Sequence, residues 1–128
     1  MVIALLASAL SAQSVATPPA QTVEEEVVVI GDKLKSWRAR VRKVDGEMRC
    51  AVLKSSGDKE IDAIGCRAMA TCLAPLEAQV IATADRKLSR AARKAARRQV
   101  ERQLTPCVMG ERTRLIEELA ERRWEASR

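Results

Sequence analysis

The chain has 128 residues, with 23 basic and 17 acidic side chains and a net charge of +6. It contains no His, Phe or Tyr and only two Trp, so a core must be built from aliphatic side chains, and we expect one small domain. Without His, catalysis would depend on carboxylates, Lys and thiols. The carboxylates lie at predicted helix starts or on solvated faces. We therefore expect that the protein is not an enzyme and that it has no catalytic residue, no cofactor and no small-molecule substrate.

Residues 1–16 are uncharged and rich in Ala, Leu and Ser. This stretch is too short to span a bilayer but is typical of a signal peptide. A signal peptide normally has Lys or Arg before its apolar run, and none precedes the apolar run here. We therefore expect the true start of the protein to lie upstream, and cleavage to follow Ser14 or Ala16. The prediction is a periplasmic or secreted protein with a signal peptide over 1–16, a linker over 17–25 and a single domain over 26–126.

The domain begins with acidic residues followed by a β-branched run, Glu24-Glu25-Glu26-Val27-Val28-Val29-Ile30-Gly31. A β-branched run ended by Gly predicts a strand. We expect this strand to complete a small antiparallel sheet over 26–54, beside a hairpin formed by the residues that follow. Helices over 58–126 would complete an α+β fold.

The hairpin is indicated by Asp45-Gly46, which is typical of a two-residue type I′ turn. Pairing outward from this turn sets Val44 opposite Glu47, Arg42 opposite Arg49, Val41 opposite Cys50, and Ala39 opposite Val52. Side chains alternate along a strand, so one face is apolar and one is basic. The apolar face collects Trp37, Ala39, Val41, Met48, Cys50 and Val52. The basic face collects Arg38, Arg40, Arg42 and Arg49.

After the hairpin, Ser55-Ser56-Gly57 predicts a turn and Asp58 an N-cap. The turn lacks the Gly-rich length and the Gly-Lys-Thr ending of a phosphate-binding loop. We expect a helix over 59–84 with a kink near Pro75. The inner stripe of this helix is predicted to be Ile61, Ile64, Ala68 and Cys72.

The run Cys50-Ala-Val-Leu-Lys-Ser-Ser-Gly-Asp-Lys-Glu-Ile-Asp-Ala-Ile-Gly-Cys66 resembles part of the C-terminal domain of TonB-type energy transducers. The resemblance covers residues 37–72 and lacks the third strand that follows in that domain. It implies a TonB-C-like β-β-α unit in the periplasm. The segment from Glu24 to Gly31 is also similar to the TonB box of outer-membrane receptors, which pairs with the transducer domain as an added strand. Both resemblances together imply internal pairing of that segment with the hairpin.

Four cysteines, an even number, follow an apolar leader and indicate an oxidising compartment. Cys66 and Cys72 are about 9 Å apart along one helix, too far to bridge each other. Cys50 lies on the hairpin face against which this helix should pack. The expected disulfides are therefore Cys50 with Cys66, and Cys72 with Cys107. A zinc site is the alternative, although no His and no Cys-x-x-Cys pair are present.

A Cys72 to Cys107 bond within one chain requires a break in the Gly-free and Pro-free run over 76–104. The expected break is over 85–89, where Asp85 stops one helix and Ser89 caps a second helix over 89–104. The result is an antiparallel helical hairpin in a monomer. The alternative is one straight helix in a dimer, with Cys72 of one chain bonded to Cys107 of the other.

The excess charge lies on one segment, since residues 86–102 carry 8 basic side chains and 1 acidic one. The candidate anion-binding residues are Arg86, Arg90, Arg93, Lys94, Arg97, Arg98 and Arg102. Such a helix attracts phosphates of lipopolysaccharide, anionic lipid or nucleic acid. Nucleic acid is the weaker alternative, because export removes the protein from it and no aromatic side chains interleave. The other interpretation is a good helix former with a solvated face.

Thr105-Pro106 predicts the start of a last helix. Its expected apolar stripe is Leu115, Ile116, Leu119, Ala120 and Trp124. We expect this stripe to pack on the helical hairpin or to bind a partner.

The predicted function is a non-enzymatic accessory or interaction protein that binds an unknown protein through the hairpin edge or the last helix. Electrostatic binding of anionic envelope material is the alternative.

Overall fold

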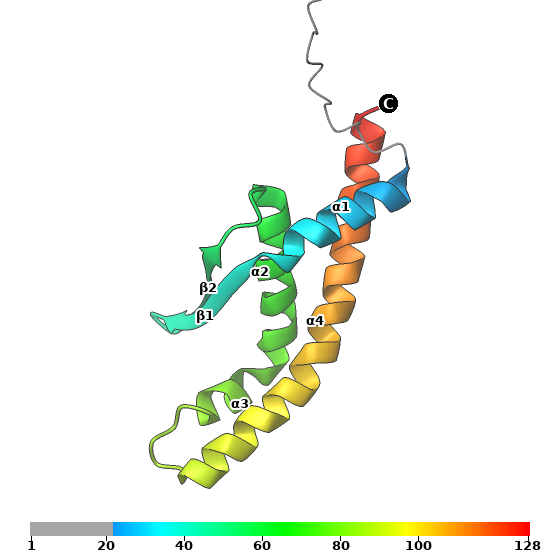
Figure 1. Ribbon diagram of the computed structural model, residues 1–128. Helices are drawn as coiled ribbons and strands as arrows, with labels where there is room; N and C mark the ends of the chain where they lie inside the picture. Colours follow the sequence, from blue (N-terminus) through cyan, green and yellow to red (C-terminus); the bar gives the residue numbers. More distant parts are fainter. Residues whose placement is uncertain (1–21) are drawn as a thin grey trace, which may run out of the picture.

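The structure is a computed structural model and describes residues 22–128. Its elements in chain order are α1 (Val23–Lys35), β1 (Arg38–Val44), β2 (Glu47–Lys54), α2 (Lys59–Leu73), the single 3₁₀ turn η1 (Ala74–Leu76), α3 (Glu77–Ala82) and α4 (Arg90–Ala126). Figure 1 shows α2 and α4 running antiparallel beside each other, α1 crossing α4 near the C-terminus, and the hairpin projecting from α2. The predicted α+β fold class is confirmed. The predicted signal peptide and residues 17–21 of the predicted linker lie outside the described residues.

The predicted N-terminal strand is wrong, because its residues form α1. The hydroxyl of Thr22 accepts a hydrogen bond from the Glu25 backbone N–H over 3.1 Å, and three glutamates occupy the first turn, where the helix dipole favours negative charge. Ile30 and Leu34 are buried one turn apart. Packing of this helical stripe outweighs the β propensity of the valine run. The sheet predicted over 26–54 therefore begins only at Arg38, and the predicted linker ends at Thr22.

The predicted kink and break between the long helices are confirmed. Pro75 lies in η1, between α2 and α3. After α3, the Asp85 carboxylate accepts a hydrogen bond from the Lys87 backbone N–H over 2.9 Å. The Ser89 hydroxyl then caps α4 by accepting from the Ala92 backbone N–H over 3.1 Å. The chain reverses here, so the antiparallel helical hairpin forms as expected.

The predicted boundary between two helices at Thr105 is wrong, because Pro106 lies inside α4, which runs for 37 residues. A proline inside a helix removes one backbone hydrogen bond and costs about 3 kcal/mol. Tertiary contacts on both sides of it hold the helix together. Leu104 packs against the core, Val108 is buried, and Cys107 is bonded to α2. Figure 1 shows α4 curving along its length rather than ending there.

The core lies between the three helices, and the hairpin contributes little to it. Four residues of α4 are buried against those of α1 and α2. The core cluster comprises Ile30, Leu34, Trp37, Ile61, Ile64, Ala68, Cys72, Val108, Leu115, Leu119 and Ala120. Of the five residues predicted as the apolar stripe of the last helix, Leu115, Leu119 and Ala120 are buried inside the chain, Ile116 packs against the core and Trp124 is half-buried. The hairpin is left as an appendage of a helical core.

Candidate functional site

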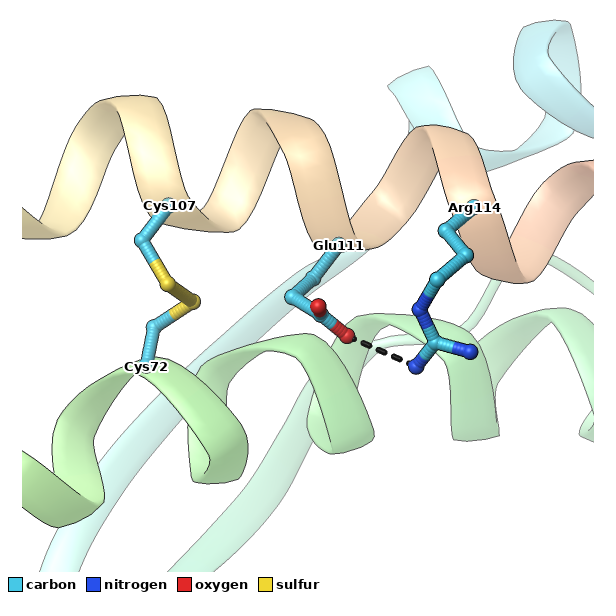
Figure 2. The surroundings of a disulfide bond; sticks show 4 residues. All are labelled: Cys72, Cys107, Glu111 and Arg114. Atoms are coloured by element: carbon cyan, nitrogen blue, oxygen red, sulfur yellow. Dashed lines mark hydrogen bonds and ion pairs between the residues drawn. A yellow bond between two sulfur atoms is a disulfide. The ribbon is translucent and has the colours of Figure 1, made fainter.

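Both predicted disulfides are confirmed, and both close within one chain. Cys50 and Cys66 join β2 to α2 with a Cα separation of 5.7 Å. Cys72 and Cys107 join α2 to α4 with a Cα separation of 5.8 Å, and Figure 2 shows this bond bridging the two helices. All four cysteines are bonded. Two disulfides indicate an extracytoplasmic protein, because reducing compartments keep thiols free.

The hairpin has the predicted register and turn. Asp45 and Gly46 have φ of 51° and 83°, as a type I′ turn requires. All four predicted cross-strand pairs occur. Val41, Met48 and Cys50 are half-buried toward α2, whereas the arginines of the opposite face are exposed. The predicted apolar face ends early, since Val52 is 43% exposed.

The sheet of the described residues has only two strands, so neither β1 nor β2 has a neighbour on its outer side. The two edges differ. The register shifts between Arg38, which pairs with Lys54, and Ala39, which pairs with Val52. Leu53 is therefore an extra residue in β2, and such a bulge disrupts the regular spacing of edge groups. The edge of β1 is regular from Ala39 to the turn.

Trp37, which was predicted only as a member of the apolar hairpin face, anchors the start of β1. It is 5% exposed and packs on Gly65 of α2. The Arg112 guanidinium lies 5.4 Å from the centre of the Trp37 ring system. Burial lowers the pKa of Arg112. A hollow of about 280 Å³ adjoins this contact. It is lined by Leu34, Lys35, Trp37, Arg38, Ala39, Val41, Met69 and Arg112.

The Ser55-Ser56-Gly57 turn is confirmed as a turn, and Asp62 occupies it. The Asp62 carboxylate accepts hydrogen bonds from both serine hydroxyls and from the Ser56 backbone N–H, the last over 2.8 Å. The hydrogen bond from Ser55, followed by those from Ser56, lowers the pKa of Asp62. The groups that could have bound an external anion therefore already bind this carboxylate.

Arg123 forms an ionic cluster that the sequence did not reveal. Its guanidinium donates to the Asp58 carboxylate over 2.7 Å and lies 3.4 Å from Glu60 and 3.8 Å from Glu26. These contacts link the end of α4 to the starts of α1 and α2. Burial raises the pKa of Asp58, but the hydrogen bonds from Arg123 and from backbone N–H groups outweigh it, so the net pKa lies below its ordinary value. Residues 65 positions apart meet here, which sequence spacing does not indicate.

The basic segment over 86–102 covers the last turn before α4 and the first third of α4. Among the described residues, no acidic side chain forms an ion pair with its members. The unpaired members are Arg86, Lys87, Arg90, Arg93, Lys94, Arg97, Arg98 and Arg102. A hollow of about 440 Å³ between the end of α3 and α4 has the lining Thr83, Arg90, Arg93, Lys94 and Arg97. The structure thus gathers four of the seven candidate anion-binding residues around one depression.

Over residues 22–128, no helix combines the length and the apolar character needed to cross a membrane. Over the same range, no three His, Cys, Asp or Glu side chains are grouped so that they could hold a metal ion. Two features of the described residues are suited to binding a partner, the free edge of β1 and the basic depression. Comparison with known protein families, characterised proteins and solved structures finds no match for this chain, so the resemblance to the TonB C-terminal domain stays a prediction.

Proposed function

We propose that this chain is a non-enzymatic interaction protein of the periplasm or the secreted fraction, and that it binds an extended segment of a partner protein by strand addition to β1. The observation that carries the proposal is the two-stranded sheet, in which no third strand from residues 22–128 lies beside β1. The residues expected to fill that position form α1 instead. Unpaired strand edges readily pair with an added chain, because their backbone groups lack partners.

The register defines which groups an added strand would meet. In an antiparallel hairpin with a two-residue turn, the pair beside the turn is hydrogen-bonded and the next pair is not. Val44 and Glu47 are the first pair. Lys43 and Val41 therefore belong to pairs that are not hydrogen-bonded, and their backbone N–H and C=O groups point away from β2. Within residues 22–128 these groups have no hydrogen-bond partner outside the hairpin.

Side-chain selectivity would come from the hollow beside Trp37. Alternate side chains of an added strand point to opposite faces. Those on the inner face would meet the apolar side chains Leu34, Ala39 and Met69. The same lining also contains three basic residues, Lys35, Arg38 and Arg112. Those on the outer face would meet Arg40 and Arg42, which are exposed and have no ion-pair partner in the described part of the chain. We expect a partner segment that alternates apolar and acidic residues.

The test uses two proline variants, one for each edge. Lys43→Pro removes an outward N–H from β1, and Val52→Pro removes one from β2, without deleting a hydrogen bond between the strands. Ten-residue peptides displayed on phage would be selected on the wild-type protein, and a recovered peptide would be synthesised for calorimetry. We expect binding to persist in salt, to be lost in Lys43→Pro and to survive in Val52→Pro. Equal binding by both variants, or no selected peptide, would contradict the proposal.

A further inference from the structure

The basic segment is placed where its own helix disfavours it. The N-terminus of a helix carries partial positive charge and is stabilised by acidic side chains. The first turn of α4 contains no acidic residue, whereas Arg90, Arg93 and Lys94 lie in its first two turns. Arg93 and Arg97 are four residues apart and repel each other, as do Arg90 and Lys94. This charge is uncompensated within the described chain, so an external anion would relieve it.

The same end of the molecule exposes apolar side chains. Ile81 at the end of α3 is 47% exposed, and Leu88 just before α4 is 37% exposed. Figure 1 shows that the turn between α3 and α4 forms one extremity of the molecule, distant from the C-terminus. A flat surface could therefore contact this turn without meeting α1 or the end of α4. We call residues 81–98 the basic tip.

We propose that the basic tip binds the anionic surface of a lipid bilayer. Arg90, Arg93, Lys94 and Arg97 bind lipid phosphates in the depression that they line with Thr83, and Ile81 and Leu88 enter the headgroup region. Basic side chains beside exposed apolar ones are the combination that interfacial lipid binding uses. Nucleic acid is disfavoured, because the tip carries no aromatic side chain to stack on bases. This inference does not depend on strand addition.

The experiment is sedimentation of the full chain with vesicles. One set contains phosphatidylcholine alone and the other contains phosphatidylcholine with phosphatidylglycerol. Each cation near an anionic surface strengthens binding about fivefold at low salt. We therefore expect the mixed vesicles to bind at least about tenfold more tightly than the neutral ones, and this difference to shrink as salt is added.

Two pairs of charge reversals locate the surface. Arg93→Glu with Arg97→Glu changes the tip. Neither side chain is buried and neither forms an ion pair within residues 22–128, so we expect the fold to be preserved. Arg40→Glu with Arg42→Glu changes the net charge equally on the exposed face of the hairpin. We expect the first pair to weaken binding to mixed vesicles at least about tenfold, and the second pair to weaken it much less. Equal weakening by both pairs would reduce the effect to overall charge and overturn the proposal.

The apolar variants distinguish lipid from other polyanions. Ile81→Ser with Leu88→Ser keeps every charge. We expect this pair to weaken vesicle binding several-fold and to leave retention on heparin unchanged. The proposal would be overturned if the protein bound duplex DNA or heparin more tightly than mixed vesicles and the serine pair had no effect. The ligand of the basic tip would then be a soluble polyanion and not a lipid. No binding to mixed vesicles at low salt would also overturn the proposal.

Discussion

Gly65 is the point at which α2 contacts Trp37, and Gly65→Ala measures how firmly the start of the hairpin is held. A Cβ at Gly65 would lie 2.6 Å from three ring atoms of Trp37, closer than a real Cβ approaches any neighbour. Replacing Gly by Ala inside a helix otherwise stabilises by about 1 kcal/mol. Overpacking costs about 1–3 kcal/mol. Trp37 is 5% exposed and three of its ring atoms would be contacted, so we expect the upper end of that range, about 2–3 kcal/mol. The net loss of stability is then about 1–2 kcal/mol.

A second glycine supplies the control. Gly110 lies in α4, and a Cβ added there has no neighbour within 4 Å among residues 22–128. Gly110→Ala should therefore stabilise by about 0.5–1 kcal/mol. Urea unfolding followed by circular dichroism should separate the two variants by about 1.5–3 kcal/mol in the free energy of unfolding. If Gly65→Ala is as stable as Gly110→Ala, the contact with Trp37 does not constrain the hairpin and the reasoning fails.

Three further changes test the helical core. Replacing Cys72 and Cys107 together by Ala opens a link across 35 positions and should cost about 3–4 kcal/mol in urea unfolding; an unchanged midpoint would contradict this. Arg123→Met should cost about 1–2 kcal/mol at pH 7. The depressed pKa of Asp58 gives stability that is present above about pH 4 and lost as the pH falls through the folded pKa. The melting temperature of the variant should therefore fall less steeply with acid than that of the wild-type protein. Parallel curves of melting temperature against pH would contradict the link between Arg123 and the pKa of Asp58. Pro106→Ala restores a backbone hydrogen bond in α4 and should stabilise by about 2 kcal/mol, whereas a lower melting temperature would show that the proline shapes the helix.

Local patterns were sufficient where a few neighbouring residues determine the structure. Asp45-Gly46 determines the turn, and the turn determines the register of the whole hairpin. The disulfides also followed, because a helix of known rise excludes Cys66 from reaching Cys72, and the hairpin register turns Cys50 toward α2. In each case a rigid local geometry left few arrangements open.

The failures have two causes: at α1 the β propensity was given more weight than local helix signals, and at Pro106 and Arg123 distant packing decides the structure. The valine run of α1 has high β propensity, yet Thr22 followed three residues later by Glu25 is a helix-capping pattern that indicated the correct structure. Ile30 and Leu34 are also spaced one helical turn apart. At Pro106 no local signal was available, since contacts from α2 keep α4 continuous. The contacts of Arg123 likewise exist only once three helices have assembled.

The two proposed surfaces can act together only if both are reachable at once. Figure 1 shows the hairpin projecting from α2 between the basic tip and the crossing point of α1, so a tip bound to lipid would hold the free edge of β1 near the same surface. A partner segment attached to that membrane would then bind at a raised effective concentration. We expect a peptide selected on β1 to bind at least about tenfold more tightly when lipid-anchored on mixed vesicles than when free in solution. Arg93→Glu with Arg97→Glu should abolish that gain and leave binding of the free peptide unchanged. Equal affinity of anchored and free peptide for the wild-type protein would mean that one surface blocks the other.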